Sequence, residues 1–415
     1  MRLYIDPGTG SMLFAILIGA LGVLRFAFKG VYVRLKFLLS GGQKVETDRD
    51  AVPLVIFSDD KRYWQVFEPV CRELDARGFD TVYMTASSDD PALTAEYPHL
   101  HAEFIGTGNK PYARLNFLNA AMLLSTTPGL DVYQWKRSKD VKWYIHMLHS
   151  MEVITYNSFG VDFYDALLLS SQHQVDEIRA LEKLRNEAEK EIRIVGVPYW
   201  DDMKARLHPA TSADTPCPTV LLAPSWGRES IFNRFGARVI QRLLETGYRI
   251  IVRPHPQSFT SEKDMLEGIM REYPESERLE WNRDANNLDV LSRSDILISD
   301  FSGVIFDFAI LHDKPVICAA ADWDPAPYDI WWLDIPMWTQ AVVPRIGPIL
   351  TEENLPQLKR LIDDCLASDV YRAGRQSLRE EAWTHRGNGA KNVADYLVEK
   401  YAQLTQPEDE RCEQG

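Results

Sequence analysis

This chain of 415 residues has fewer basic than acidic residues. It contains 46 Lys and Arg and 60 Asp and Glu, which gives a formal net charge of −14. Nucleic-acid binders neutralise phosphates with clustered basic residues. The charge balance therefore excludes a general nucleic-acid binder and leaves room for one local basic pocket. Cysteine is scarce too: the five cysteines are scattered and none are paired at metal-ligand spacing. This excludes a disulfide framework and favours a reduced compartment.

One long apolar run stands near the N-terminus. Residues 12–24 are apolar or glycine, and residues 26–28 extend the run past Arg25. The total of about 17 residues is the lower limit for spanning a bilayer. Basic residues follow the run, so the positive-inside rule puts the N-terminus outside and the rest of the chain in the cytoplasm. We expect a single-pass anchor in the inner or plasma membrane. A monotopic anchor is one alternative, because residues 31–39 alternate basic and apolar side chains, and a soluble hairpin is another.

Beyond the anchor, strand-like and helix-like segments alternate, which predicts parallel sheets covered by helices. In the first predicted domain, we expect strands at residues 54–58, 80–84, 121–126, 142–146, 165–170 and 192–195. We predict an α/β fold of two Rossmann-like domains facing across a cleft, similar to the glycosyltransferase-B architecture and preceded by an N-terminal membrane helix. The predicted parts are an anchor with a basic segment (1–40), a linker (41–50), an acceptor domain (51–210), a linker (211–218), a donor-nucleotide domain (219–402) and an acidic tail (403–415).

Two polar motifs follow apolar runs in the second predicted domain: Arg253-Pro254-His255-Pro256 and Ser299-Asp300-Phe301-Ser302-Gly303. Ligands of open α/β sheets bind at the carboxyl ends of strands. The motifs therefore predict one phosphate site, with Arg253 as a charged fork and His255 aimed by its stiff prolines. Ser302 is expected to cap the next helix, and Gly303 to let the backbone approach phosphate. A plain capping role for Ser302 and Asp300 stays open.

Histidines also follow a run in the first predicted domain, at His146-Met147-Leu148-His149-Ser150. Imidazole titrates near neutrality, which suits a general base for an acceptor hydroxyl. We favour His149, because the following turn suggests exposure, and keep His146 and Ser150 as acceptor-side candidates. Two histidines without a third ligand nearby do not predict a metal site. Ser225, in the segment after the first strand of the second domain, is a further phosphate-binding candidate. The same segment is equally well explained as a simple turn between a strand and a helix.

These segments resemble the CDP-glycerol glycerophosphotransferase family of teichoic-acid polymerases and primases. Residues 253–256 match its Arg-x-His-Pro motif, and residues 294–308 match its SD-L-I-[ST]-D-[YF]-S-S-x-x-F-D-F segment. Ala223-Pro224-Ser225-Trp226 resembles its Ala-Pro-Thr-Trp. The resemblance covers roughly residues 140–345. Gly303 stands where the family often has a second serine, and Leu148-His149-Ser150 where it has His-Gly, so the chain resembles a divergent member.

The resemblance implies a metal-independent transferase that needs no cofactor and moves glycerol phosphate from CDP-glycerol to a hydroxyl acceptor in cell-envelope polymer synthesis. It implies that His255 stabilises the diphosphate and the CMP leaving group, that Ser302 contacts phosphate, and that His149 activates the acceptor. The expected partners are a CDP-activated polyol phosphate, a lipid-linked or polymer acceptor and the membrane, with no nucleic acid. Two alternatives remain: a CMP- or UDP-sugar glycosyltransferase or epimerase on the same fold, and a non-catalytic nucleotide-binding membrane scaffold.

Overall fold

The structure is a computed structural model that describes residues 52–207, 217–284, 287–319, 324–368 and 370–406. The predicted membrane helix and the 41–50 linker lie outside these ranges, as does most of the 211–218 linker. No helix within the described ranges is long and apolar enough to cross a membrane.

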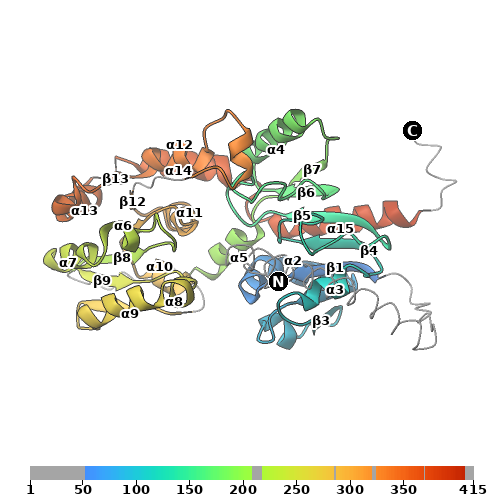
Figure 1. The fold of residues 1–415 in the computed structure, drawn as a ribbon, viewed down its shortest axis with the longest axis horizontal. Helices are drawn as coiled ribbons and strands as arrows, with labels where there is room; N and C mark the ends of the chain where they lie inside the picture. The colour runs from blue at the N-terminus through green and yellow to red at the C-terminus, as the bar shows by residue number, and fades with distance from the viewer. Residues whose placement is uncertain (1–51, 208–216, 285–286, 320–323, 369, 407–415) are drawn as a thin grey trace, which may run out of the picture. The chain divides into compact units, whose positions relative to one another are not determined.

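The N-terminal half is built on a parallel sheet of seven strands in the order β3-β2-β1-β4-β5-β6-β7 (Figure 1). Its strands are β1 (Val52–Ser58), β2 (Thr81–Thr85), β3 (Leu100–Phe104), β4 (Ala120–Ser125), β5 (Val141–Met147), β6 (Ala166–Leu169) and β7 (Glu191–Ile194). Leu54 to Phe57 in β1 are completely buried, as expected of a central strand covered on both faces. The helical segments of this half are η1 (Lys61–Tyr63), α2 (Trp64–Ala76), η2 (Pro91–Thr94), α3 (Lys110–Leu115), α4 (Gln172–Arg185) and α5 (Pro198–Arg206).

The C-terminal half contains a second parallel sheet, of six strands in the order β10-β9-β8-β11-β12-β13. Its strands are β8 (Thr219–Ala223), β9 (Arg249–Val252), β10 (Leu279–Trp281), β11 (Ile296–Ser299), β12 (Val316–Ala319) and β13 (Ile349–Leu350). The helical segments are α6 (Ile231–Phe235), α7 (Arg238–Glu245), α8 (Ser258–Ser261), α9 (Lys263–Glu272), α10 (Leu288–Ser292), α11 (Val304–Phe306), the π-helix η3 (Asp307–His312), η4 (Asp329–Trp332), α12 (Trp338–Ile346), η5 (Leu355–Gln357), α13 (Leu358–Ala367) and α14 (Arg372–Ala382).

Both sheets therefore have the Rossmann strand order, in which the direction of winding reverses beside the first strand. The reversal lies between β1 and β4 in the first sheet and between β8 and β11 in the second. Polar side chains that follow these strands lie at the two places where doubly wound sheets bind ligands. The predicted α/β class with parallel sheets is confirmed.

The last helix, α15 (Gly389–Thr405), returns to the N-terminal half. Its buried residues Val393, Ala394, Tyr396 and Leu397 belong to the same core cluster as α2 and one face of the first sheet. Figure 1 shows this helix, in red, beside the strands of that sheet. The range 219–402 predicted for the second domain thus includes a helix that packs on the first, and the helix continues past residue 403, where the acidic tail was expected to begin. An apolar helical face packs where an uncovered sheet face offers burial, whatever its place in the chain.

Candidate active site

His149 lies just beyond β5 and contacts three neighbouring side chains. Its Nδ1 bonds the hydroxyl of Thr126, the residue after β4, and lies 3.5 Å from the hydroxyl oxygen of Tyr156. The ring of Tyr63 meets the imidazole edge to face at 4.8 Å. Within the described residues no hydrogen bond reaches Nε2 of His149, so this nitrogen is the one left for a substrate.

His149 is exposed at the surface, as its position before Ser150 and the turn suggested, yet its ring has protein atoms on most sides. This enclosure, with the positive charge of Arg62, lowers the pKa of His149 to about 4. The imidazole is therefore neutral at physiological pH, which is the state that a general base requires.

His146, the other candidate, is completely buried. Its Nε2 lies 3.3 Å from the hydroxyl oxygen of Tyr156, and burial lowers its pKa to about 3. Ser150 donates its hydroxyl to the carbonyl oxygen of Glu152, 2.8 Å away. Of the predicted acceptor-side residues, His149 alone combines surface exposure with a free ring nitrogen.

His255 lies in the loop after β9. Its Nδ1 faces a hydrogen-bond donor, whereas Nδ1 of His149 faces two hydroxyl groups. The backbone N–H of Gln257 donates to Nδ1 of His255 at 3.1 Å. A nitrogen that accepts a hydrogen bond carries no proton, so the neutral ring has its proton on Nε2. Burial and the charge of Arg62 lower the pKa of His255 and thereby favour this neutral form. His255 is thus a hydrogen-bond donor through Nε2.

Arg253 uses its guanidinium to organise the loop that follows β10. Nε donates to Asn287 at 2.9 Å, one terminal nitrogen bonds Asn282, and the other donates to the carbonyl oxygen of Asp284 at 2.8 Å. Two of the five N–H donors of the fork remain for a ligand. Its role in holding phosphate stays a prediction, and the structure adds a role in shaping the loop.

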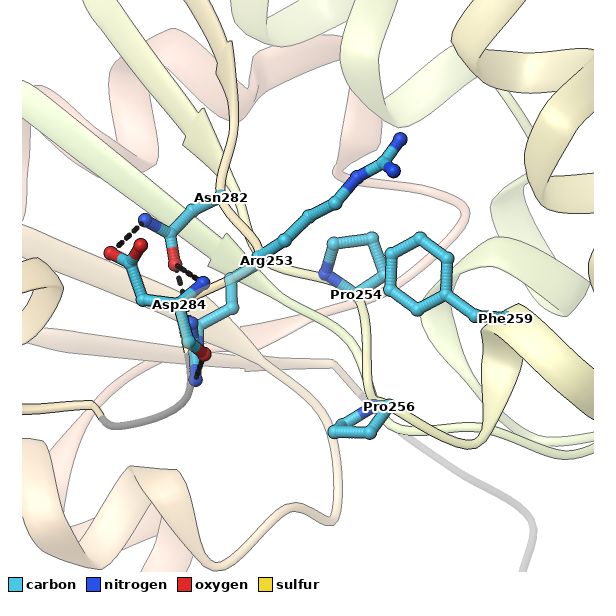
Figure 2. A pocket seen from close by; sticks show the side chains of 7 residues that line it. Arg253, Pro254, Pro256, Phe259, Asn282 and Asp284 are labelled. Carbon is cyan, nitrogen blue, oxygen red and sulfur yellow. Dashed lines mark hydrogen bonds between the residues drawn. The ribbon is translucent and has the colours of Figure 1, made fainter. Parts of the chain in front are cut away.

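A pocket of about 340 Å³ opens beside this loop. It is lined by Arg253, Pro254, Pro256, Phe259, Asn282, Arg283 and Asp284. Figure 2 shows the ring of Phe259 beside Pro254, with Asn282 and Asp284 across from them. One wall is therefore apolar, and the other offers both hydrogen-bond donors and acceptors. The volume is within the range of small-ligand sites.

Asp300 and Ser225 meet at the reversal point of the second sheet. The carboxylate of Asp300 is buried and accepts hydrogen bonds from the backbone N–H groups of Ser225 (3.0 Å) and Ile231 (2.9 Å). Asp300 therefore fixes the course of the loop between β8 and α6. The structure brings the two predicted residues together, with the carboxylate directed at that loop.

Ser302 and Gly303 begin the helical segment that follows β11. The hydroxyl oxygen of Ser302 accepts a hydrogen bond from the backbone N–H of Val304 at 3.4 Å, which leaves its own proton for another acceptor. Gly303 has an ordinary helical φ of −58°, and within the described part of the chain no heavy atom outside its sequence neighbours and its own helix backbone lies within 4 Å of the position its Cβ would take. The open space beside Gly303 is compatible with the predicted approach of a ligand.

The sequence interpretation missed Arg62, Thr126 and Tyr156. Arg62 belongs to η1 after the first strand, and its charge acts on both His149 and His255. Placement after a central strand could have identified Arg62 and Thr126, since the same argument selected the histidines. Nothing in the sequence marks Tyr156, which reaches the site through a long loop.

Comparison with known proteins shows which family the chain resembles. Residues 146–329 match the family model of CDP-Glycerol:Poly(glycerophosphate) glycerophosphotransferase. The chain is also 28% identical, over 257 residues, to the teichoic acid glycerol-phosphate primase of Bacillus spizizenii. The chain is therefore similar to the CDP-glycerol glycerophosphotransferase family. The match covers 57% of this chain and 59% of the primase, so the chain spans well under two thirds of that relative.

Solved structures support the fold of this chain. The wall teichoic acid polymerase TagF superposes with a TM-score of 0.58 at 16% identity, covering 91% of this chain and 98% of the polymerase chain. A putative UDP-N-acetylglucosamine 2-epimerase from Listeria monocytogenes gives the same TM-score at 11% identity, covering 86% of this chain and 98% of its own. The two Rossmann-like halves therefore have the glycosyltransferase-B architecture that the sequence predicted.

Proposed function

We propose that this chain transfers glycerol phosphate, or a related polyol phosphate, from a CDP-activated donor to a hydroxyl acceptor in the synthesis of a cell-envelope polymer. The observation that carries the proposal is the opposite arrangement of two histidines. His149 has a free Nε2 and hydroxyl partners on Nδ1, whereas His255 has a backbone N–H on Nδ1 and a proton on Nε2. One is suited to take a proton and the other to donate a hydrogen bond. The family match supports CDP-glycerol as the donor.

In the proposed reaction, the acceptor hydroxyl gives its proton to Nε2 of His149 while its oxygen attacks the β-phosphorus of the donor. The bond from that phosphorus to the bridging oxygen breaks, and its electron pair leaves with CMP. Nε2–H of His255 donates to a diphosphate oxygen, where negative charge grows in the transition state. The hydroxyl of Ser302 donates to the same phosphates, and Arg62 supplies a positive charge from the N-terminal half.

The pocket beside Arg253 is the proposed site of the donor's nucleoside. It adjoins His255 in sequence through Pro254 and Pro256, so a nucleoside there would direct its phosphates toward the imidazole. Phe259 and the prolines offer an apolar surface for a base. Asn282 and Asp284 offer the donors and acceptors that a pyrimidine edge requires.

The decisive experiment incubates the purified full-length protein with CDP-glycerol, CDP-ribitol, CMP-sugars and UDP-sugars in separate reactions, each with a hydroxyl acceptor, and measures release of CMP or UDP. We expect CMP from a CDP-polyol, loss of that release in His255→Ala, and no loss in the matched variant His101→Ala, whose imidazole is exposed on β3. Release of UDP alone would overturn the proposal in favour of a sugar transferase or epimerase. Nucleotide binding without turnover would favour the non-catalytic scaffold.

We further propose that residues 12–28 attach the protein to the inner or plasma membrane with the catalytic halves in the cytoplasm, where nucleotide donors are made. The support is the apolar run followed by Arg25, Lys29, Arg34 and Lys36. Extraction of membranes with alkaline carbonate tests this: a spanning segment keeps the full chain in the membrane, and a monotopic anchor releases it. Recovery of all the protein in the supernatant before extraction would contradict both forms of attachment.

A further inference from the structure

Two hydroxyl groups from different elements surround Nδ1 of His149. Thr126 follows β4 at the reversal point of the first sheet, and Tyr156 belongs to the loop between β5 and β6. Thr126 is completely buried and Tyr156 is 9% exposed. Water therefore has little access to replace either hydroxyl, and the hydrogen bonding of Nδ1 is decided by these two side chains.

His146 lies behind Tyr156. Its Nε2 is 3.3 Å from the tyrosine hydroxyl oxygen, and the two rings meet edge to face at 5.5 Å. Because His146 is buried and neutral, its Nε2 can accept the hydroxyl proton of Tyr156. A hydroxyl that donates to His146 presents its lone pairs to His149.

We propose that Thr126, Tyr156 and His146 are positioning residues that hold the proton of neutral His149 on Nδ1 and so leave Nε2 free to take the acceptor's proton. This inference rests on the proposed function for its chemical purpose, while the protonation state it describes exists without substrate. It assigns His146 an indirect role, acting through Tyr156.

The chemistry of the partners supports this assignment. A hydroxyl oxygen can accept a hydrogen bond from Nδ1–H both before and after Nε2 takes a second proton, so the support persists through the reaction. A backbone N–H can only donate, and would oppose a proton on Nδ1. That is the partner of His255, whose proposed task is to donate through Nε2. The two histidines thus have partners matched to opposite tasks.

The direct test is ¹⁵N NMR of the full-length protein with labelled histidine, recorded near neutral pH without substrate. We expect His149 protonated on Nδ1 and unprotonated on Nε2. Thr126→Val should shift the population toward Nε2–H, and Thr126→Ser, which keeps the hydroxyl, should restore the wild-type signal. A wild-type His149 with its proton on Nε2 would overturn the proposal, whatever the substrate.

Kinetics provide the second test once CMP release is established. We expect Thr126→Val to lower kcat about 100-fold, the lower end of what general-base catalysis contributes, with KM for the donor unchanged. Thr126→Ser should stay within about threefold of the wild type.

Thr81→Val, which removes a buried hydroxyl at the start of β2, is the matched control. Tyr156→Phe provides an independent variant should Thr126→Val fold poorly. Wild-type kcat in both Thr126→Val and Tyr156→Phe would refute the positioning role. Absence of CMP release from the wild type would refute the proposed function and leave the NMR result standing.

Discussion

Single residues set the charge state of this site, and Arg62 has the widest influence among them. It belongs to the turn after the first strand, where its Nε donates to Asp60 at 3.0 Å. Its guanidinium carbon lies 5.8 Å from the centre of the Tyr63 ring, which in turn contacts His149. Burial is the main cause of the lowered pKa of both histidines, and the positive charge of Arg62 lowers it further in the free protein. A bound diphosphate would offset that charge and make His149 a stronger base.

Replacing Arg62 with glutamine should therefore raise the pKa of His149 above its value of about 4, toward the ordinary histidine value of about 6.5. The sign follows from electrostatics, because removing a nearby positive charge makes the imidazolium less costly. NMR titration of His149 measures the change directly. Arg72→Gln, which removes a surface arginine paired with Asp202, is the matched control. An unchanged or lower pKa in Arg62→Gln would contradict this role.

His146 should make stability depend on pH. Its pKa is about 3 in the folded protein and about 6.5 when unfolded, so between these values the unfolded chain binds more protons. Its contribution is complete above about pH 6.5 and declines as pH falls, by about 1.4 kcal/mol per pH unit. The stability difference between wild type and His146→Gln should therefore move against the wild type on going from pH 7 to pH 4.5. Denaturant unfolding at both pH values measures it, and a constant difference would contradict the prediction.

At the scale of elements, hydrophobic runs predicted the central strands well. The expected strands 54–58 and 121–126 correspond to β1 and β4, which are buried on both faces and read as continuous apolar segments. β3 was missed because it is an edge strand with no fully buried residue. The helix that Ser302 was expected to cap is a short α-turn followed by a π-helix, since hydrogen-bond register depends on packing that the sequence does not display.

The contacts within the site, like the type of the helix after β11, could not be predicted from the sequence. The rule that ligands bind at the carboxyl ends of strands identified His149 and His255 from the sequence. The protonation of their rings, however, depends on Thr126, Tyr156 and the backbone of Gln257. Those contacts arise only when separate elements pack together. The sequence therefore predicts where the site lies, and the tertiary structure decides which nitrogen of each histidine acts.

The packing of α14 on α12 depends on a glycine. A Cβ at Gly374 would lie 1.9 Å from the carbonyl oxygen of Arg345. Gly374→Ala must push the two helices apart, and we expect a loss of about 3 kcal/mol in unfolding free energy. Gly268→Ala is the matched control, because its Cβ position within α9 is open and alanine should stabilise that helix by about 0.5–1 kcal/mol. Equal effects of the two substitutions in chemical denaturation would show that the close contact does not matter.

At the scale of the described molecule, segments late in the chain fasten the two halves together. α15 covers the first sheet, and Thr339 at the start of α12 bonds the buried carboxylate of Glu152 through both its N–H and its hydroxyl, each at 2.8 Å. The indole of Trp200 on α5 donates to Asp307 at 2.7 Å. These connections matter for function, because Arg62 and His149 belong to one half and His255 to the other.

Asp329 makes the most deeply buried of these connections. It is 1% exposed, pairs with Arg185 of α4, and accepts the backbone N–H of Phe159 at 2.8 Å. Asp329→Ala would remove one of two carboxylates from a buried guanidinium, the other being Asp162. We expect a loss of about 3 kcal/mol in unfolding free energy, near the lower end for breaking a buried ion pair because Asp162 remains.

Asp324→Ala, which removes an exposed carboxylate, is the control and should change stability by less than about 0.5 kcal/mol. Hydrogen exchange should accelerate in residues 325–333 and around Phe159 in Asp329→Ala alone. Unchanged exchange in both segments would mean that this ion pair does not hold the halves together.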